Sequence, residues 1–274
     1  MTNQNNRFSS RFTFLLSALG IAVGTGNIWR FPRIVASNAG EDGAGAFLVA
    51  WITFLFLWSI PLIIVEYIMG RQSRMGTVGA FSNFMGKPFA FLGGFVGVVS
   101  TAIAFFYSVI VGWNIYYFGA IIITDLPQTS DASLALWSSF QNSSFPILFH
   151  AVAMTVGGLA IYKGVSSIEK VNKILIPVLL GIVLLSVFRA LSLPGSLEGI
   201  TYLFTPDWSQ LKRPGIWVDA LAQNAFDTGA GFGLFLTYAI YIRKRYGIVK
   251  NAFTTAIGNN LVSLMAAIMI FSTV

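Results

Sequence analysis

Two apolar stretches of the chain carry glycines and polar side chains where a membrane-spanning helix should be regular. Residues 20–27 (GIAVGTGN) hold three glycines within seven residues and end in Asn27. Residues 225–233 (AFDTGAGFG) hold three glycines within five residues and the carboxyl group of Asp227. An unsatisfied backbone N–H or C=O in hydrocarbon costs several kcal/mol, so such a break persists only where it lines a cavity. Broken helices bind anions at half-helix N-termini and cations at freed carbonyls, as in secondary transporters. The two segments therefore predict a binding site halfway across a membrane.

The composition predicts an all-α integral membrane protein. Of 274 residues, 55% are hydrophobic and 10% are charged, and the mean hydropathy is +0.74. A soluble domain has about 25% charged residues. A span needs about 20 apolar residues, and seven stretches approach that length, at about 12–37, 45–70, 89–124, 146–163, 171–191, 215–242 and 249–274. Pro61 is expected to interrupt the second. The chain has no cysteine, which excludes disulfides, thiolate metal sites and cysteine catalysis.

The charges predict the orientation of these spans. The net charge is +7, and Lys and Arg concentrate at the N-terminus and in the loops that follow spans two, four and six. The alternate segments, 125–145 and 189–214, read as polar outer loops and carry most of the acidic residues outside the spans. This positive-inside pattern places the N-terminus in the cytoplasm. The basic balance therefore reflects topology and not binding to nucleic acid.

For several of these polar residues the pattern leaves two interpretations open. Asn27 could form a hydrogen bond between helices, and Asp227 could be a structural partner, although carboxylates within a membrane are usually functional. Arg30 could extend to the outer interface or close the site as a gate. Glu66 and the lone His150 are interpreted as structural.

Three motifs resemble the neurotransmitter:sodium symporter family, which includes the bacterial leucine transporter. They are residues 24–32 (GTGNIWRFP), the second-span run 45–71, and residues 223–233 (QNAFDTGAGFG). The resemblance covers essentially the whole chain. It implies a fold of about twelve helices in a five-plus-five inverted repeat, with helices 1 and 6 unwound. The chain then reads as a single domain, 1–274, with a first repeat at about 10–190 and the start of a second at about 215–274. Because it ends within an apolar span, a longer native protein is expected.

The resemblance also implies site residues. It places the substrate against Thr25, Gly26, Ile103, Tyr107, Phe226, Gly229 and Phe232. It implies one or two sodium ions held by the carbonyls of Gly20, Ala22 and Val23 and by Asn27, Asp227 and Asn259. Arg30 and Phe226 correspond to an outer gate, and the family's anion site corresponds to Gln223, Asp227 and Ser263.

The chain departs from the family pattern at four positions. Gly229 stands where the leucine transporter has serine, which enlarges the pocket. Gly24 stands where monoamine carriers have aspartate, which leaves room for the carboxylate of an amino acid. Asp227 stands where Ser or Thr is usual, and we expect its fixed charge to replace chloride. If it binds the sodium ion, that ion no longer needs the substrate's carboxylate. Phe8 replaces a tryptophan of the inner gate, which Arg7 and Arg11 otherwise resemble.

These observations predict a sodium-coupled symporter for an amino acid or a related small solute, working by alternating access. The alternative is an inactive truncated fragment or a non-transporting membrane scaffold. An enzyme is not expected, because the chain lacks a His-rich metal set and a Ser–His pairing beyond His150. No organic cofactor is expected. The predicted partners are the substrate and the lipid bilayer of a bacterial inner membrane, and a homodimer is compatible with this prediction.

Overall fold

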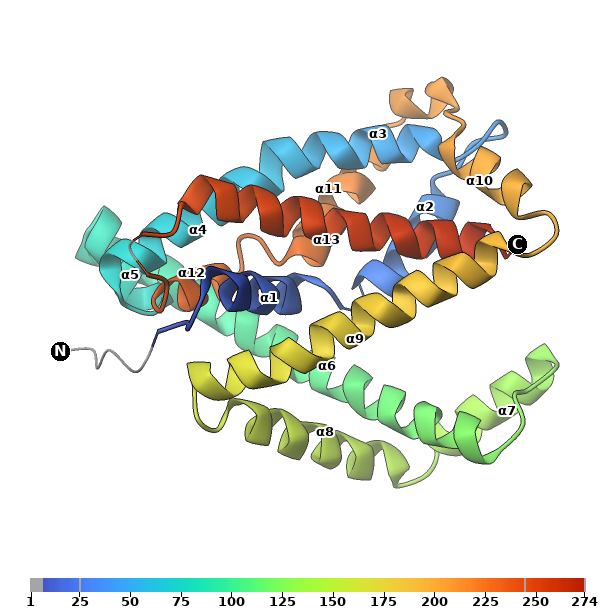
Figure 1. The fold of residues 1–274 in the computed structure, drawn as a ribbon, viewed down its shortest axis with the longest axis horizontal. Helices are drawn as coiled ribbons and strands as arrows, with labels where there is room; N and C mark the ends of the chain where they lie inside the picture. Colours follow the sequence, from blue (N-terminus) through green and yellow to red (C-terminus); the bar gives the residue numbers. More distant parts are fainter. Residues whose placement is uncertain (1–6, 25, 244, 274) are drawn as a thin grey trace.

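All seven apolar stretches predicted from the sequence form helices, and no strand occurs in the part of the chain that the structure describes. The structure is a computed structural model and describes residues 7–24, 26–243 and 245–273. Its long helices run lengthwise through the molecule (Figure 1). In chain order the elements are α1 (Arg11–Ala22), the π-helical turn η1 (Gly26–Arg30), α2 (Phe31–Ser37), α3 (Gly45–Phe54), the π-helical turn η2 (Leu55–Ser59), α4 (Ile60–Ser73), α5 (Thr77–Met85), the 3₁₀ turn η3 (Lys87–Phe89), α6 (Ala90–Ile123), α7 (Ser130–Gln141), α8 (Phe145–Ile161), α9 (Val165–Leu191), α10 (Ser196–Phe204), the 3₁₀ turn η4 (Trp208–Lys212), α11 (Pro214–Thr228), α12 (Leu234–Ala239) and α13 (Ile248–Phe271).

The lengths and apolar character of these helices fit a membrane protein. Four helical segments are long and apolar enough to cross a membrane, and they coincide with predicted spans two, three, five and seven. Two bent pairs pass the same test together and cover predicted spans one and four. The first pair, α1 with η1 and α2, bends by 54°. The remaining predicted span, 215–242, is divided between α11 and α12.

The prediction that Pro61 interrupts the second span is wrong. The helix continues through this residue, and Gly45–Ser73 form one span. Pro61 lies in the first turn of α4, directly after the π-helical turn η2. Proline lacks an N–H and its ring collides with the carbonyl four residues earlier, so a wider turn before it keeps the helix continuous. Ser59, at the end of that turn, donates to Asn224 Oδ1 on α11 at 3.2 Å.

The two predicted outer loops are more ordered than expected. Residues 125–145 contain α7, whose first turn is capped by the Thr129 side chain, which accepts from the N–H of Ala132 at 3.2 Å. Asp131 lies in the same turn, where the helix dipole favours a negative charge. Residues 189–214 contain the end of α9, then α10 and η4. The polar composition of both segments was interpreted as loop, so these short amphipathic helices were not predicted.

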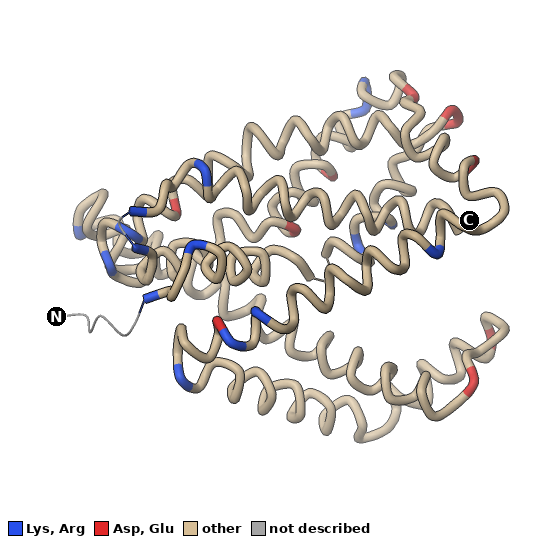
Figure 2. Tube along the Cα trace, viewed as in Figure 1, with Lys and Arg blue, Asp and Glu red and all other residues tan. Residues whose placement is uncertain are grey.

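The charges separate along the length of the bundle. Figure 2 shows most Lys and Arg at the end where the start of α1, α5 and α12 lie, and several acidic residues at the opposite end, near α7 and α10. Between the two ends the outward surface is apolar. Of the 34 residues of α6, for example, Gly93 and Gly112 are the two that are buried, so the apolar side chains of this helix are at least partly exposed. The arrangement suits a body surrounded by hydrocarbon with its two charged ends in water.

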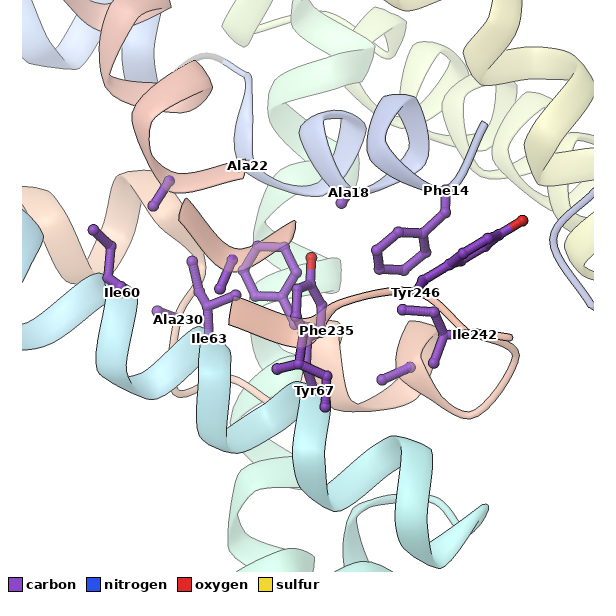
Figure 3. Packing of buried hydrophobic residues seen from close by; sticks show 14 of the residues in the cluster. Phe14, Ala18, Ala22, Ile60, Ile63, Tyr67, Ala230, Phe235, Ile242 and Tyr246 are labelled. Atoms are coloured by element: carbon purple, nitrogen blue, oxygen red, sulfur yellow. The ribbon is translucent and has the colours of Figure 1, made fainter. Parts of the chain in front are cut away.

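A buried apolar cluster holds the broken helices against α4. Tyr67 of α4 is fully buried between Phe14 of α1 and Phe235 of α12, with ring centroids 5.4 and 5.7 Å from its own. Figure 3 shows these three rings meeting with Ile63, from the preceding turn of α4, beside them. This core therefore fixes the segment before the first break and the segment after the second, whereas α2 and α11 pack with α3 in a separate cluster.

The tight approach of α4 to α12 depends on Gly70. A Cβ at this position would lie 2.0 Å from the carbonyl oxygen of Leu236, on α12. We expect Gly70→Ala to destabilise the protein by about 1–3 kcal/mol or more, because overpacking forces the two helices apart. Gly181→Ala in α9 is the matched control, since a Cβ there meets no atom within 4 Å. Apparent melting temperatures of the purified proteins in detergent measure the difference, and equal values for the two variants would contradict the prediction.

Candidate functional site

The first span is broken where the sequence predicts it. Helix α1 ends at Ala22 with an extended Val23, and helical structure resumes as a π-turn at Gly26. Asn27 stabilises the intervening backbone, because its Oδ1 accepts a hydrogen bond from the N–H of Gly24 at 2.8 Å. Thr25, one of the predicted substrate residues, lies outside the described residues.

The sixth span is broken between Thr228 and Leu234. The three glycines of this segment have φ values of +67°, +95° and +71°, a region that glycine adopts without the steric cost a side chain brings. The freed backbone is bound by Glu66 of α4. Its carboxylate accepts from the N–H groups of Gly231 at 2.6 Å and Leu236 at 3.0 Å. Glu66 therefore connects α4 to the break and satisfies two donors that no longer bond within a helix.

The two breaks face one cavity of about 430 Å³. Helix α6 supplies its opposite wall. All described members of the predicted substrate set line it, namely Gly26, Ile103, Tyr107, Phe226, Gly229 and Phe232. Four of the predicted ion ligands also line it, namely Gly20, Ala22, Val23 and Asp227.

Beside this cavity lies a fully enclosed group of polar side chains from the first, sixth and seventh spans. Asn27 Nδ2 donates to Asn259 Oδ1 and to Ser263 Oγ, each at 2.8 Å. Ser263 Oγ in turn donates to Asp227 Oδ2 at 2.8 Å. Gln223 Nε2 donates to the carbonyl of Gly26 at 3.3 Å. All five side chains are at most 2% exposed. The structure thus brings together the three side chains predicted as ion ligands, Asn27, Asp227 and Asn259, and the residues of the predicted anion cluster.

The two predicted gate residues meet where this cavity adjoins a second one. The guanidinium of Arg30 lies over the Phe226 ring, 4.9 Å from its centroid, and its Nη1 donates to Gln223 Oε1. Phe226 stacks on Tyr107 with centroids 6.0 Å apart. Phe226 lines both the 430 Å³ cavity and a cavity of about 850 Å³ on the side of the predicted outer gate, which is called the outer cavity below. It therefore lies, with Gly24 and Gly26, where the two spaces adjoin.

Sequence reasoning missed the aromatic wall of the outer cavity. Trp113 and Tyr117 of α6 line it together with Trp137 of α7, and the Trp113 and Trp137 rings pack edge to face at 5.1 Å. The signal that could have found this wall was the pair of aromatic residues one helical turn apart, at positions 113 and 117. The partner of this pair, Trp137, lies in a segment that the sequence analysis interpreted as a loop.

The N-terminal segment packs against α9, α12 and α13 at the end of α1 away from the first break. Phe8 is 1% exposed and packs against Phe14 and Tyr238, with centroids 5.2 and 5.8 Å away. Arg11 Nε donates to Asn251 Oδ1 of α13 at 2.8 Å. Glu169 of α9 accepts from the N–H of Ser9 at 2.7 Å and from the Thr13 hydroxyl. Phe8 therefore occupies a buried position although it is smaller than tryptophan.

Comparison with known proteins agrees with this geometry. A profile of the Sodium:neurotransmitter symporter family matches residues 5–138 and 142–274. An uncharacterised sodium-dependent transporter of Methanocaldococcus jannaschii is 33% identical over 98% of this chain and 56% of its own length. The sodium-dependent neutral amino acid transporter B(0)AT3 of Rattus norvegicus is 31% identical over 98% of this chain and 48% of its own length.

A solved structure shows the same fold. The crystal structure of MhsT in complex with L-phenylalanine is 33% identical in sequence and superimposes with a TM-score of 0.86. The match covers 97% of this chain and 60% of MhsT, so the chain spans about three fifths or less of these relatives. They are transporters and not enzymes. The chain therefore belongs to the sodium:neurotransmitter symporter family.

Proposed function

We propose that the protein is a sodium-coupled symporter for an amino acid or a related small solute. One observation carries the proposal. Both broken spans wall a single cavity, with the buried side chains of Asn27, Asn259 and Asp227 next to it. Freed backbone groups and side-chain oxygens at such breaks are what transporters use to bind a cation and its cargo together. The sodium-dependent relatives support the assignment of the ion.

The sodium ion is bound beside the cavity. Its proposed ligands are the Ala22 carbonyl, Asn27, Asp227 and Asn259, because these groups are buried together and one oxygen of Asp227 has no hydrogen-bond partner in the described part of the chain. A second ion would use the carbonyls of Gly20 and Val23. Both lie at the end of α1, where carbonyls lose their intrahelical partners.

The substrate occupies the 430 Å³ cavity with its amino-acid backbone near Gly26 and Tyr107. Two observations support an amino acid. A Cβ at Gly24 would meet no atom within 4 Å, so this position leaves space next to the first break. Two relatives are also associated with amino acids, because MhsT was crystallised in complex with L-phenylalanine and the rat protein B(0)AT3 is a neutral amino acid transporter.

Transport then requires that the two ends of this space open in turn. Arg30 and Phe226 close the outer end, and the segment around Phe8 closes the inner end. The basic end of the bundle, which includes the N-terminus, faces the cytoplasm, because positive residues are retained on that side (Figure 2). The outer cavity faces the opposite side. The two breaks act as the hinge regions of this motion.

Asp227 makes this transport independent of chloride. Its carboxylate receives the Ser263 hydroxyl at 2.8 Å in the same buried cluster as Gln223, and so supplies a fixed negative charge there. We expect uptake into proteoliposomes to be unchanged when gluconate replaces chloride. The variant Asp227→Ser should take up substrate only when chloride is present. Strong chloride dependence of the unmodified protein would contradict this proposal.

Sodium-dependent ligand binding tests the proposed function itself. The full-length protein is purified in detergent and exposed to each of the twenty amino acids in sodium chloride and in potassium chloride. We expect at least one of them to bind in sodium and not in potassium. Absence of sodium-dependent binding across the panel would favour the alternative, a membrane scaffold or a fragment without activity of its own.

A further inference from the structure

The carbonyl of Phe232, in the break of the sixth span, has lost the donor that a continuous helix would give it. Phe232 lies between α11 and α12. In an α-helix its carbonyl would accept from the N–H of Leu236, four residues further on. That N–H donates instead to the carboxylate of Glu66 at 3.0 Å. Ser100 of α6 supplies a replacement, because its hydroxyl donates to the Phe232 carbonyl at 2.5 Å.

The Ser100 hydroxyl has a second acceptor, which does not depend on it. Its oxygen lies 2.9 Å from the carbonyl oxygen of Val96, one turn earlier in α6. That carbonyl is within a regular helix and therefore also has the backbone N–H of Ser100 as a donor. A serine hydroxyl carries one proton. Of its two acceptors, the carbonyl of Phe232 is therefore the one that needs this proton.

The bond between Ser100 and Phe232 connects two walls of the 430 Å³ cavity. Ser100 lines this cavity together with Ile103 and Tyr107, which belong to the same helix. Phe226 and Phe232, from the sixth span, also line it. Any motion that widens the cavity between α6 and the sixth span must therefore lengthen this bond.

The segment that contains Phe232 is attached to α4 on its other side. The carboxylate of Glu66 accepts from two of its N–H groups, and the Tyr67 ring packs on the Phe235 ring with centroids 5.7 Å apart. Towards α6 the backbone approaches closely, since a Cβ built on Gly233 would lie 2.9 Å from Cγ1 of Val96. Glu66 thus binds the donors of the break, whereas Ser100 binds one of its acceptors and sets its position against α6.

We propose that Ser100 is a positioning residue of the substrate site. Its hydroxyl holds the Phe232 carbonyl against α6, and this bond must break before the cavity opens between α6 and the sixth span. The inference rests on the proposed function, because Phe232 is one of the residues that we expect to contact the substrate. With the bond in place, this wall has its shape before the substrate arrives. Binding then does not have to order it, which preserves affinity.

Hydrogen–deuterium exchange of the full-length protein, in sodium and without substrate, tests whether the bond holds the segment. The amides of Gly231 and Leu236 are hydrogen-bonded and should exchange slowly in the unmodified protein. In Ser100→Ala we expect residues 229–236 to exchange about fivefold faster, which is the effect of losing one hydrogen bond of ordinary strength. Exchange in α13 should stay unchanged, because the opening is local.

Substrate binding tests whether this position matters for the site. The dissociation constant of the amino acid that binds best in the panel above should rise about fivefold in Ser100→Ala. Thr101→Ala is the matched control on the same helix, since its exposed hydroxyl donates to the carbonyl of Gly97 within α6. It should change neither exchange nor binding. Ser100→Cys, whose thiol is a weak donor, should lie between Ser100→Ala and the unmodified protein, and it decides the question if Ser100→Ala does not fold.

The outcomes separate this proposal from the proposed function. The exchange measurement needs no ligand, so it still tests the bond if no amino acid binds in a sodium-dependent manner and the proposed function fails. Unchanged exchange of residues 229–236 in Ser100→Ala overturns the positioning role while the proposed function stands. Faster exchange that extends equally to α13 also overturns it, because that is a general loss of stability. An unchanged dissociation constant despite faster local exchange does the same.

Discussion

Asn27→Ala is expected to weaken sodium-dependent substrate binding by about 100-fold, because two or more buried groups lose their partner and each such loss costs about 1–3 kcal/mol. The Asn27 side chain bonds to the N–H of Gly24, to Asn259 Oδ1 and to Ser263 Oγ. Its removal releases the backbone of the first break and separates it from the seventh span. A sodium titration of substrate binding to the purified protein measures the effect. We expect the sodium concentration needed for half-maximal binding to rise.

A control asparagine distinguishes this effect from a general cost of substitution. Asn142 caps the end of α7, far along the chain from both breaks, and its backbone N–H bonds to the carbonyl of Ser138. Asn142→Ala should therefore leave the sodium titration unchanged. The proposed ion site would be wrong if Asn27→Ala bound substrate with the sodium dependence of the unmodified protein. It would also be wrong if the variant melted at a lower temperature but showed no change in binding once folded.

The helices and both breaks were predictable because their signals are local. A run of about twenty apolar residues is a span whatever its neighbours are. Likewise, glycines beside Asn27 or Asp227 disturb the helix at their own position. The alternation of charge between successive loops is also visible without a structure. The spans at 45–73 and 248–271 therefore agree closely with those expected from the sequence.

The contacts that join the site were not predictable from such signals. Ser263 is 236 residues from Asn27, and Glu66 is 165 residues from Gly231, yet each pair is in direct contact. The composition of the segments that contain these residues does not indicate which oxygen accepts a hydrogen bond from which donor. The resemblance to a known family supplied the ion and substrate positions. It did not supply the bare Oδ1 of Asp227, because this residue departs from the family pattern and its environment depends on how α11, η1 and α13 pack together.

Removing the carboxylate of Glu66 is expected to have the largest effect on stability. In Glu66→Leu the N–H groups of Gly231 and Leu236 lose their acceptor, and Leu236 is fully buried. Two unpaired amides cost about 2–6 kcal/mol together, which lowers the apparent melting temperature by on the order of 10 °C. Glu66→Gln should be intermediate, because its single carbonyl oxygen can replace one of the two acceptors while its amide group opposes the other N–H.

The same variants test whether the sixth break is held by this residue or by its glycines alone. If Glu66 holds it, Glu66→Leu should also lose sodium-dependent binding at temperatures where it is folded, since Asp227 and Gly229 are at the other end of the segment that Glu66 fixes. Glu198→Gln, in an exposed turn of α10, is the matched control and should change neither property. A Glu66→Leu variant with normal melting and normal binding would show that the positive φ angles of the three glycines suffice to maintain the break. The carboxylate would then have no part in positioning Asp227.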